Sequence, residues 1–267
     1  MAHRPMPTQT PGIQVEAQSD LPPGSAELAR GKVLTLLDEV REPVLFVRIR
    51  LTRSNNPATE RPYLAQANVD VNGRAARAHV ASETMPEAID LMQDRLSLQL
   101  ARLRRHWETL RGEMPAAGEH GWRHGAEPTH RPDHFPRPAE EREVIRHKSF
   151  SLARETPDEA VFEMDGMDYG FHLFTELATG EDSVVYRAAP TGYRLAQVHP
   201  QPEKIGTTAV PLTVSPAPAP RLTVATAKTR MDTLGQPFVF FADEVTRRGN
   251  VLYHRYDGHY GLITPAE

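Results

Sequence analysis

The sequence predicts an α+β protein: an N-terminal β-α-β-β-β-α domain, with a four-stranded sheet and two helices on one face, followed by two tandem small α+β C-terminal units. Three observations support this fold class. Short runs of alternating apolar and polar residues indicate strands, two longer stretches with apolar residues at steps of three and four indicate helices, and the second half of the chain repeats itself.

The N-terminal domain is expected over residues 12–111. Its first strand is short, because apolar and polar residues alternate only over residues 13–17. The break Pro22-Pro23-Gly24 follows, and Ser25 is the expected N-cap of a helix that ends before Pro43.

Three strands and a long helix complete this domain. Alternating residues predict strands near 45–52, 65–71 and 76–80, and Asn72-Gly73 predicts a tight hairpin between the second and the third of these. In the first of the three, one face is expected to carry Leu45, Val47, Ile49 and Leu51. A helix is expected over residues 86–110, with one apolar stripe formed by Ile89, Met92, Leu96, Leu100, Leu103 and Trp107.

The rest of the chain alternates between Pro-rich segments and patterned ones. Residues 1–11 are expected to form a flexible tail and residues 112–142 a flexible linker, since Pro, Gly, His and charged residues replace the apolar pattern there. Two C-terminal units are expected over residues 143–199 and 221–267, joined by a Pro-rich connector over 200–220.

The two C-terminal units are copies of one another. At an offset of 67, residues 156–195 align with 223–262 without a gap, and eleven of these 40 pairs are identical. Chance would give about two or three. Each copy reads as a strand, a short helix and two or three strands. Eight aromatic residues are expected in the core of the copies or at an interface between them: Phe171, Phe174, Tyr186, Tyr193, Phe238, Phe241, Tyr253 and Tyr260.

Composition and motifs argue against several classes of protein. The chain has no cysteine, which excludes disulfides, thiolate catalysis and the usual structural zinc sites. It has no run of 18 apolar residues and no signal-peptide pattern at its N-terminus, so a cytoplasmic protein without membrane contact is expected. No motif for catalysis or for a phosphate-cradling loop is present, and we expect neither a cofactor nor a small-molecule substrate.

Four histidines of the linker form two pairs with helical spacing. They are His120 and His124, and His130 and His134. Such pairs can bind a metal from one helix face. The intervening Pro and Gly oppose a helix, so solvated linker residues are the simpler interpretation, and no metal site is predicted.

Charge is unevenly distributed along the chain. The whole sequence has a net charge of −4, but residues 40–111 carry twelve arginines against eight acidic residues. Arginine forks bind phosphate well. The candidate nucleic-acid-binding residues are Arg48, Arg50, Arg95, Gln99, Arg102, Arg104 and Arg105. An ordinary solvated helix face remains an alternative, because four acidic residues share the long helix.

The chain resembles the long-form ribosome hibernation promoting factors of bacteria. On the long helix, Ala88-Ile89-Asp90, Asp94-Arg95-Leu96 and Gln99-Leu100 follow the pattern of that family and lead into basic residues. In the C-terminal half, Glu159-Ala160 and Tyr260-Gly261-Leu262-Ile263 also match. The duplicated C-terminal unit is similar to stress- or hypoxia-type actinobacterial members.

The resemblance implies a non-enzymatic translation inhibitor that stabilises idle ribosomes in the bacterial cytoplasm during stress. The N-terminal domain would bind the small ribosomal subunit and its 16S rRNA in the channel for mRNA and tRNA. In the family, a single C-terminal domain usually pairs with that of another chain and couples two ribosomes. Here the two copies are expected to pair within one chain as a pseudo-dimer, which would favour single ribosomes.

Two other functions stay open at this point. The chain could be a free RNA- or protein-binding regulator whose C-terminal repeats recruit a partner, or a metal-dependent enzyme that uses the linker histidines. Co-sedimentation with ribosomes separates the first from a hibernation factor, and metal analysis tests the second.

Overall fold

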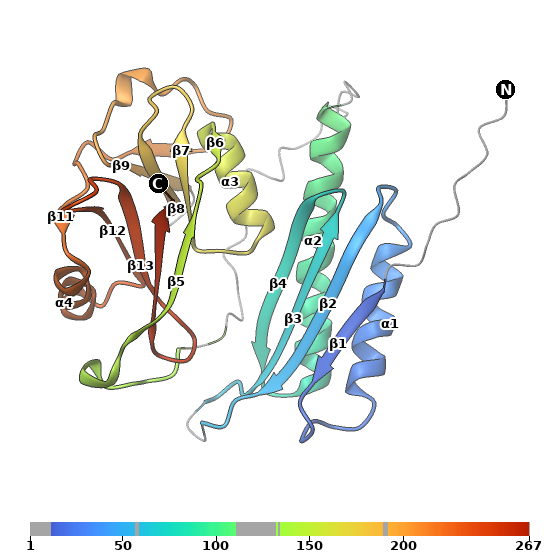
Figure 1. Ribbon diagram of the computed structural model, residues 1–267. Helices are drawn as coiled ribbons and strands as arrows, with labels where there is room; N and C mark the ends of the chain where they lie inside the picture. The colour runs from blue at the N-terminus through green and yellow to red at the C-terminus, as the bar shows by residue number, and fades with distance from the viewer. Residues whose placement is uncertain (1–11, 57–58, 111–131, 133, 189–191, 267) are drawn as a thin grey trace, which may run out of the picture. The chain divides into compact units, whose positions relative to one another are not determined.

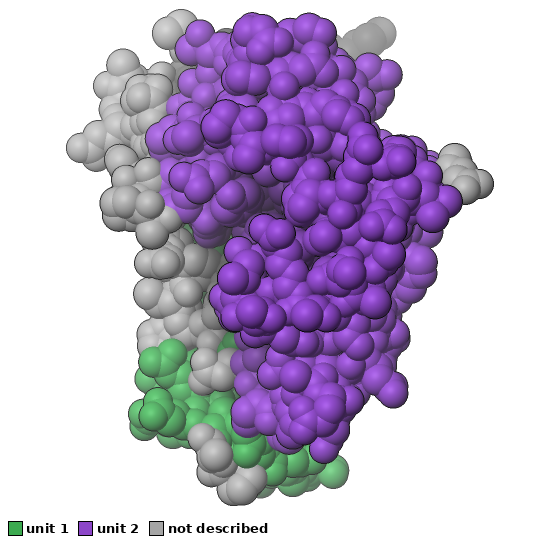
Figure 2. All heavy atoms as spheres, turned by 90° about the vertical axis from the view of Figure 1, so that its left-hand side faces the viewer, with its two compact units in different colours: residues 1–119, 127–133, 166–168 green, residues 120–126, 134–165, 169–267 purple. Residues whose placement is uncertain are grey.

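The computed structural model describes residues 12–56, 59–110, 132, 134–188 and 192–266. These residues form two compact units, which are coloured separately in Figure 2. The first unit contains the described residues up to 110 with residues 132 and 166–168, and the second contains 134–165, 169–188 and 192–266. In the described part of the chain, no helix is long and apolar enough to cross a membrane.

The first unit has the predicted β-α-β-β-β-α order, and both of its helices lie on one face of the sheet (Figure 1). Strand β1 runs parallel to β2, whereas β2, β3 and β4 are antiparallel neighbours in the order β1-β2-β3-β4. The predicted fold class is therefore confirmed for this unit. Its elements are β1 (Ile13–Ala17), α1 (Ser25–Leu37), β2 (Val44–Arg53), β3 (Tyr63–Val71), β4 (Arg74–Ser82) and α2 (Met85–Leu110).

The β3–β4 hairpin has the turn that its sequence predicts. Asn72 and Gly73 both have positive φ, 51° and 83°, as the two central residues of a type I′ turn require. Asp70 Oδ1 also accepts a hydrogen bond from the backbone N–H of Gly73 at 2.8 Å. Asn and Gly tolerate this left-handed conformation, so the turn fixes the register of the two strands.

Two local predictions for the first unit are wrong. Ser25 is not the N-cap of α1: Gly24 occupies that position with φ 79°, while the Ser25 hydroxyl donates to the carbonyl of Pro22 at 2.6 Å. Leu45 does not share the buried face of β2 and is 61% exposed. The pairing of β2 with β3 shifts register between Val44 and Phe46, and this irregularity turns Leu45 outward.

The core of the first unit lies between the sheet and the helices. The inward-facing residues of β3 and β4 are Ala and Val, so α2 can pack closely against these two strands. Helix α2 contributes the stripe that its spacing predicts, of which the described side chains Ile89, Met92, Leu96, Leu100 and Leu103 are buried.

The second unit contains two sheets, two helices and two short 3-10 helices (Figure 1). Its elements up to β10 are η1 (Ala139–Glu141), β5 (Val144–Phe150), β6 (Arg154–Glu155), α3 (Pro157–Gly166), β7 (Phe171–Glu176), β8 (Asp182–Arg187), β9 (Tyr193–Gln197), η2 (Pro202–Lys204) and β10 (Leu212–Val214). The others are β11 (Arg221–Leu222), α4 (Val224–Leu234), β12 (Phe238–Asp243), β13 (Gly249–His254) and β14 (Tyr260–Pro265).

The copies exchange one strand each. One sheet has the order β10-β9-β8-β7-β6 and the other β11-β12-β13-β14-β5. Strand β5 precedes the aligned repeat of the first copy, residues 156–195, but pairs in parallel with β14 of the second copy. Strand β10 precedes the aligned repeat of the second copy, residues 223–262, but pairs in parallel with β9 of the first. The offset of 67 places β10 at the position equivalent to β5, so the exchange is reciprocal.

Three apolar clusters hold the second unit together. Helix α3 and the first sheet enclose one cluster around Met164 and Phe174, and α4 and the second sheet enclose another around Met231 and Phe241. The third cluster combines residues of both sheets, namely Leu173, Val184, Val198, Phe240, Ala242 and Val251. Successive strand residues point to opposite faces, so each sheet contributes both to its own helix core and to the shared core.

Candidate nucleic-acid interface

Strand β2 separates arginines from apolar residues. Val47, Ile49 and Leu51 point into the core and are fully buried, while Arg48 and Arg50 between them are exposed. The alternation follows from the period of two along a strand. Because both helices cover the opposite face, the two arginines lie on the open face of the sheet.

Polar side chains form two rows across the open face, and each row contains one of these arginines. Across the sheet, Arg50 lies opposite Gln66, and Gln66 lies opposite His79. The neighbouring row begins with Gln14 and continues through Arg48, Asn68 and Arg77. We call the set Arg48, Arg50, Gln66, Asn68, Arg77 and His79 the open-face polar surface.

The arginines of this surface differ in how they are held. Arg48 forms an ion pair with Glu16 of β1, and Arg77 contacts the ring of His79 at 3.2 Å. Among the described residues, no side chain pairs with Arg50. Its cross-strand neighbours are Glu16 on β1 and Gln66 on β3, and its exposed guanidinium offers hydrogen-bond donors to phosphate and ribose oxygens.

Helix α2 provides the second group of predicted residues. Arg104 is exposed and pairs with no described side chain, and Arg102 and Arg105 are half-buried on the same part of the helix. Together they place three guanidiniums within four residues, which suits the closely spaced charges of a phosphate backbone.

Arg95 and Gln99, two of the predicted nucleic-acid-binding residues, are buried and do not lie on an exposed surface with the arginines that follow them. The Gln99 side chain is fully buried, and its Oε1 accepts a hydrogen bond from Arg102 at 3.3 Å. Gln99 lies three residues after Leu96 and four before Leu103, which places it beside the packed stripe. Within the first unit, Arg95 donates to Asp168 Oδ1 at 2.7 Å, and its side chain is 10% exposed.

Four members of the open-face polar surface, Gln66, Asn68, Arg77 and His79, were not singled out as candidates from the sequence. They alternate with buried Ala and Val residues of β3 and β4, and that alternation is the signal that could have identified them. Sequence alone does not give the register that brings them beside Arg48 and Arg50.

The eight predicted aromatic residues divide into two groups. The helix–sheet cores contain Phe174 and Tyr193 in the first copy and Phe241 and Tyr260 in the second. The shared core has the other four at its margin: Phe171, Tyr186, Phe238 and Tyr253. The rings of Phe171 and Phe238 lie 4.8 Å apart, so the two copies meet at equivalent aromatic residues.

Each helix–sheet core contains one buried tyrosine bonded to a carboxylate. The hydroxyl of Tyr193 donates to Asp165 Oδ2 at 2.8 Å, and that of Tyr260 donates to Asp232. Burial and the hydrogen bond to Asp232 raise the pKa of Tyr260 to about 12. Arg187 pairs with the aspartate of the first copy, and Arg142 pairs with that of the second at 2.7 Å.

The part of the chain that the structure describes contains no group of three or more residues suited to hold a metal ion. His134 stacks on Tyr256 with ring centroids 5.1 Å apart and contacts the carbonyl of Arg255 through Nδ1. The other linker histidines, His120, His124 and His130, lie outside the described residues.

Comparison with known proteins identifies relatives of both parts of the chain. The family model described as "Sigma 54 modulation/S30EA ribosomal protein C terminus" matches residues 139–195 and 214–262. The dormancy associated translation inhibitor of Mycobacterium tuberculosis is 39% identical over 226 residues, which cover 82% of this chain and 76% of that protein. The ribosome hibernation promotion factor of Deinococcus radiodurans is 26% identical over 180 residues, covering 61% of this chain and 85% of that protein.

A solved structure is similar to a smaller part of the chain. A ribosomal subunit interface protein from Coxiella burnetii is 25% identical, with a TM-score of 0.29, and the match covers 35% of this chain and 97% of that one.

An α+β unit with exposed arginines, followed by two S30EA-type C-terminal units and matched by relatives named as translation inhibitor and ribosome hibernation factor, defines a non-enzymatic protein of the translation apparatus. The chain belongs to the long-form ribosome hibernation promoting factor family. This membership confirms the resemblance found in the sequence and excludes the metal-dependent enzyme.

Proposed function

We propose that this protein inhibits translation by binding the small ribosomal subunit in the channel for mRNA and tRNA, and that it stabilises idle ribosomes during stress. The observation that carries the proposal is the 39% identity, over 82% of the chain, to a protein named as a dormancy associated translation inhibitor. No reaction is involved, because a bound domain blocks the channel by occupying it.

The first unit has the charge that this role requires. The exposed arginines of β2 and α2 supply guanidiniums for phosphate oxygens, and the amides beside Arg48 and Arg50 can bond to ribose hydroxyls. Phosphate contacts of this kind position a protein on RNA with little dependence on base sequence. We therefore assign rRNA contact to Arg48, Arg50, Arg102, Arg104 and Arg105.

Arg95 and Gln99 have a different role in this proposal. Gln99 is buried and accepts a hydrogen bond from Arg102, so it orients that arginine. Arg95 forms an ion pair with Asp168, so it stabilises the fold of the first unit. Both act through the helix and do not touch RNA directly.

The second unit acts as an intrachain pseudo-dimer in this proposal. Two features support the pairing: a core shared by both sheets, and the reciprocal exchange of β5 and β10. Two copies in one chain meet at a high effective concentration, which favours their pairing over pairing between chains. The protein then leaves idle ribosomes single.

Co-sedimentation with ribosomes at increasing salt tests the ribosome-binding part. The charge reversals Arg50→Glu and Arg104→Glu, made together, should weaken binding at least tenfold and reduce the slope of log K against log salt by about two. Arg230→Glu on α4 makes the same type of change on an exposed arginine of the other unit and should leave binding unchanged.

Two results would contradict the proposal. Unchanged ribosome binding by the double variant would show that these arginines are not the contact surface. Equal binding to free RNA and to ribosomes would favour a free RNA-binding regulator. Sucrose gradients address the pairing separately, because a ribosome dimer peak that depends on residues 144–267 would contradict single ribosomes.

A further inference from the structure

The two copies are related by a local twofold axis in the shared core. Phe171 and Phe238 occupy equivalent positions under the offset of 67, and the centroids of their rings lie 4.8 Å apart. The contact of Phe171 with Tyr253 at 5.7 Å has its counterpart in the contact of Phe238 with Tyr186 at 5.5 Å. Equivalent residues that touch each other mark the position of the axis.

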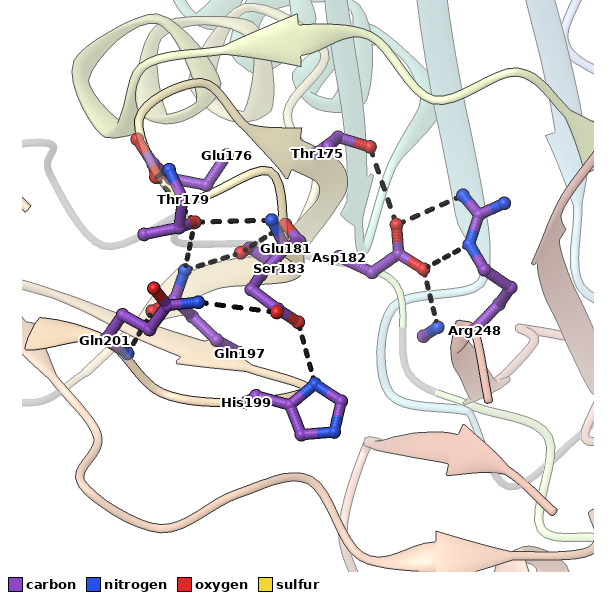
Figure 3. A network of polar contacts seen from close by, with 11 residues as sticks. Thr175, Glu176, Thr179, Glu181, Asp182, Ser183, Gln197, His199, Gln201 and Arg248 are labelled. Carbon is purple, nitrogen blue, oxygen red and sulfur yellow. Dashed lines mark hydrogen bonds and ion pairs between the residues drawn. The ribbon is translucent and has the colours of Figure 1, made fainter. Parts of the chain in front are cut away.

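A second contact between equivalent positions lies at Asp182 and Gly249. The carboxylate of Asp182 accepts a hydrogen bond from the backbone N–H of Gly249 at 2.8 Å. Arg248 reaches the same carboxylate with Nε at 2.7 Å and a terminal nitrogen at 3.1 Å, as Figure 3 shows. The Asp182 side chain is 7% exposed and that of Arg248 is 43% exposed, so the carboxylate is buried at the contact between the copies while the guanidinium keeps contact with water.

The sequence differs between the copies at these very positions. The counterpart of Arg248 in the first copy is Glu181, and the counterpart of Asp182 in the second copy is Gly249. Glu181 pairs with His199 of its own copy at 3.0 Å, so the first copy presents the Asp182 carboxylate at the axis, and the second presents the Arg248 guanidinium and the Gly249 N–H that bond to it. The hydrogen bond from Arg248 to Asp182 raises the pKa of Arg248, which is the direction expected for a stable ion pair.

Shape follows the same division. A Cβ placed on Gly249 would lie 2.8 Å from Cβ of Asp182 and 2.8 Å from the ring of Phe240. Glycine is needed there because no side chain fits. The first copy has Leu173 at the position of Phe240, so each copy is small where the other is large.

Pairing of like copies from two chains would lose both kinds of complementarity. Two first copies would bring Asp182 against a second Asp182, with the Cβ atoms in the overlap that Gly249 avoids, and would replace Arg248 by Glu181. Two second copies would place Arg248 against a second Gly249 in place of the Asp182 carboxylate and leave the Gly249 N–H without its acceptor. Like charges and unpaired buried groups disfavour a contact strongly.

We propose that the copies have diverged into an acidic and a basic half at this axis, so that the first copy accepts the second copy of the same chain and rejects its own duplicate. The inference rests on the intrachain pairing proposed above and adds what enforces it. The first copy therefore fits a partner that has a basic residue followed by glycine at this place, as the second copy has in Arg248 and Gly249.

Exchange of the axis residues between the copies tests the proposal in the full chain. One variant makes the second copy acidic through Phe240→Leu, Arg248→Glu and Gly249→Asp, and the other makes the first copy basic through Leu173→Phe, Glu181→Arg and Asp182→Gly. We expect each one-sided variant to lower the midpoint of thermal unfolding of the second unit by about 5 °C or more. The variant with all six changes restores complementarity and should recover most of this loss.

If the six-change variant recovers stability, the loss in the one-sided variants comes from a mismatch between the copies and not from destabilisation of each copy by itself. The proposal is overturned if the acidic variant is as stable as the original chain, or if the six changes destabilise by the sum of the two sets. All measurements use free protein without ribosomes. Their failure is therefore distinct from a failure of ribosome binding, which co-sedimentation of the unaltered chain measures.

Discussion

The sheet of the first unit and the two sheets of the second use their faces differently. In the first unit, helices cover one face and the other carries exposed Arg48 and Arg50. In the second unit, each sheet has a helix core on one face and contributes to the shared core with the other. One sheet keeps a face for a partner, whereas the other two use both faces for folding.

The burial patterns along the strands show the same difference. Strand β2 alternates buried apolar and exposed basic residues, as expected for a sheet with one solvated face. Strands β8 and β12 each contain four consecutive buried residues, as expected where both faces are covered. Burial on two faces also explains how copies of about 50 residues form a stable unit, because each contributes apolar surface to two cores.

The largest expected effect concerns a residue of the covered sheets. Phe174 is fully buried between α3 and the first sheet, and Phe174→Ala should lower the free energy of unfolding of the second unit by about 3–5 kcal/mol. Phe241→Ala at the equivalent position should give a similar loss, because Phe241 is equally buried. Chemical denaturation followed by circular dichroism measures both.

Leu45→Ala is the matched control in the first unit. Leu45 is 61% exposed beside the irregularity of β2, so its truncation should change stability by less than about 0.5 kcal/mol. A loss as large as that of Phe174→Ala would mean that the open sheet face is covered, and the contrast between the units would fail.

Local pattern was enough to predict the order of elements in the first unit. Alternation placed β2, β3 and β4, and Asn72-Gly73 placed their turn, because these signals act between neighbouring residues. Leu45 was misplaced because a register shift depends on the partner strand, which a pattern along one strand does not contain. Ser25 was misjudged since glycine in the left-handed conformation can replace a side-chain cap.

Long-range pairing was beyond the sequence pattern. The repeat was visible at an offset of 67, but nothing in it shows that β5 pairs with β14 or that β10 pairs with β9. Strand β10 has three residues and follows Pro211, and β5 is separated from its partner β14 by most of the second unit. In the candidate site, the arginines of β2 were found by alternation, whereas the exclusion of Gln99 required knowledge of how α2 packs.

The next largest expected effect is the loss of stability when the buried tyrosine hydroxyl of either copy is removed. Tyr193→Phe and Tyr260→Phe remove the hydrogen bonds to Asp165 and Asp232, and each should lower the free energy of unfolding by about 1–3 kcal/mol, since the acceptor is a charged buried carboxylate. The losses should be similar, because Arg187 or Arg142 still pairs with the remaining aspartate. Denaturation curves in which one variant is neutral would show that the copies are not equivalent.

A smaller effect tests the open face of the first unit. Glu16→Gln removes the carboxylate that pairs with Arg48 and should tighten ribosome binding about two- to fivefold at low salt, which is the scale of an exposed ion pair. The variant should also steepen the salt dependence, because a freed guanidinium can contact one more phosphate. Weaker or unchanged binding in a filter-binding or co-sedimentation assay would place the ribosome on another surface.

The smallest expected effect is a pH dependence of the stability of the second unit. Burial, and then the positive charges of Arg142 and His134, lower the pKa of His254, against a weaker opposing effect of Asp232. The unfolded chain therefore takes up a proton at His254 near pH 6.5, its ordinary value, while the folded chain does so at lower pH. Between those values the unfolded state binds more protons, so the free energy of unfolding falls as the pH is lowered.

His254→Gln removes this proton uptake and gives the measurement. The stability of the original chain relative to the variant should decrease as the pH is lowered from 7.5 to 5.5, and should be constant above about pH 7.5, where His254 is neutral in both states. Denaturation of the second unit at several pH values follows the difference. A difference that grows as the pH falls would mean that protonated His254 is stabilised in the fold, against the burial and the neighbouring cations described here.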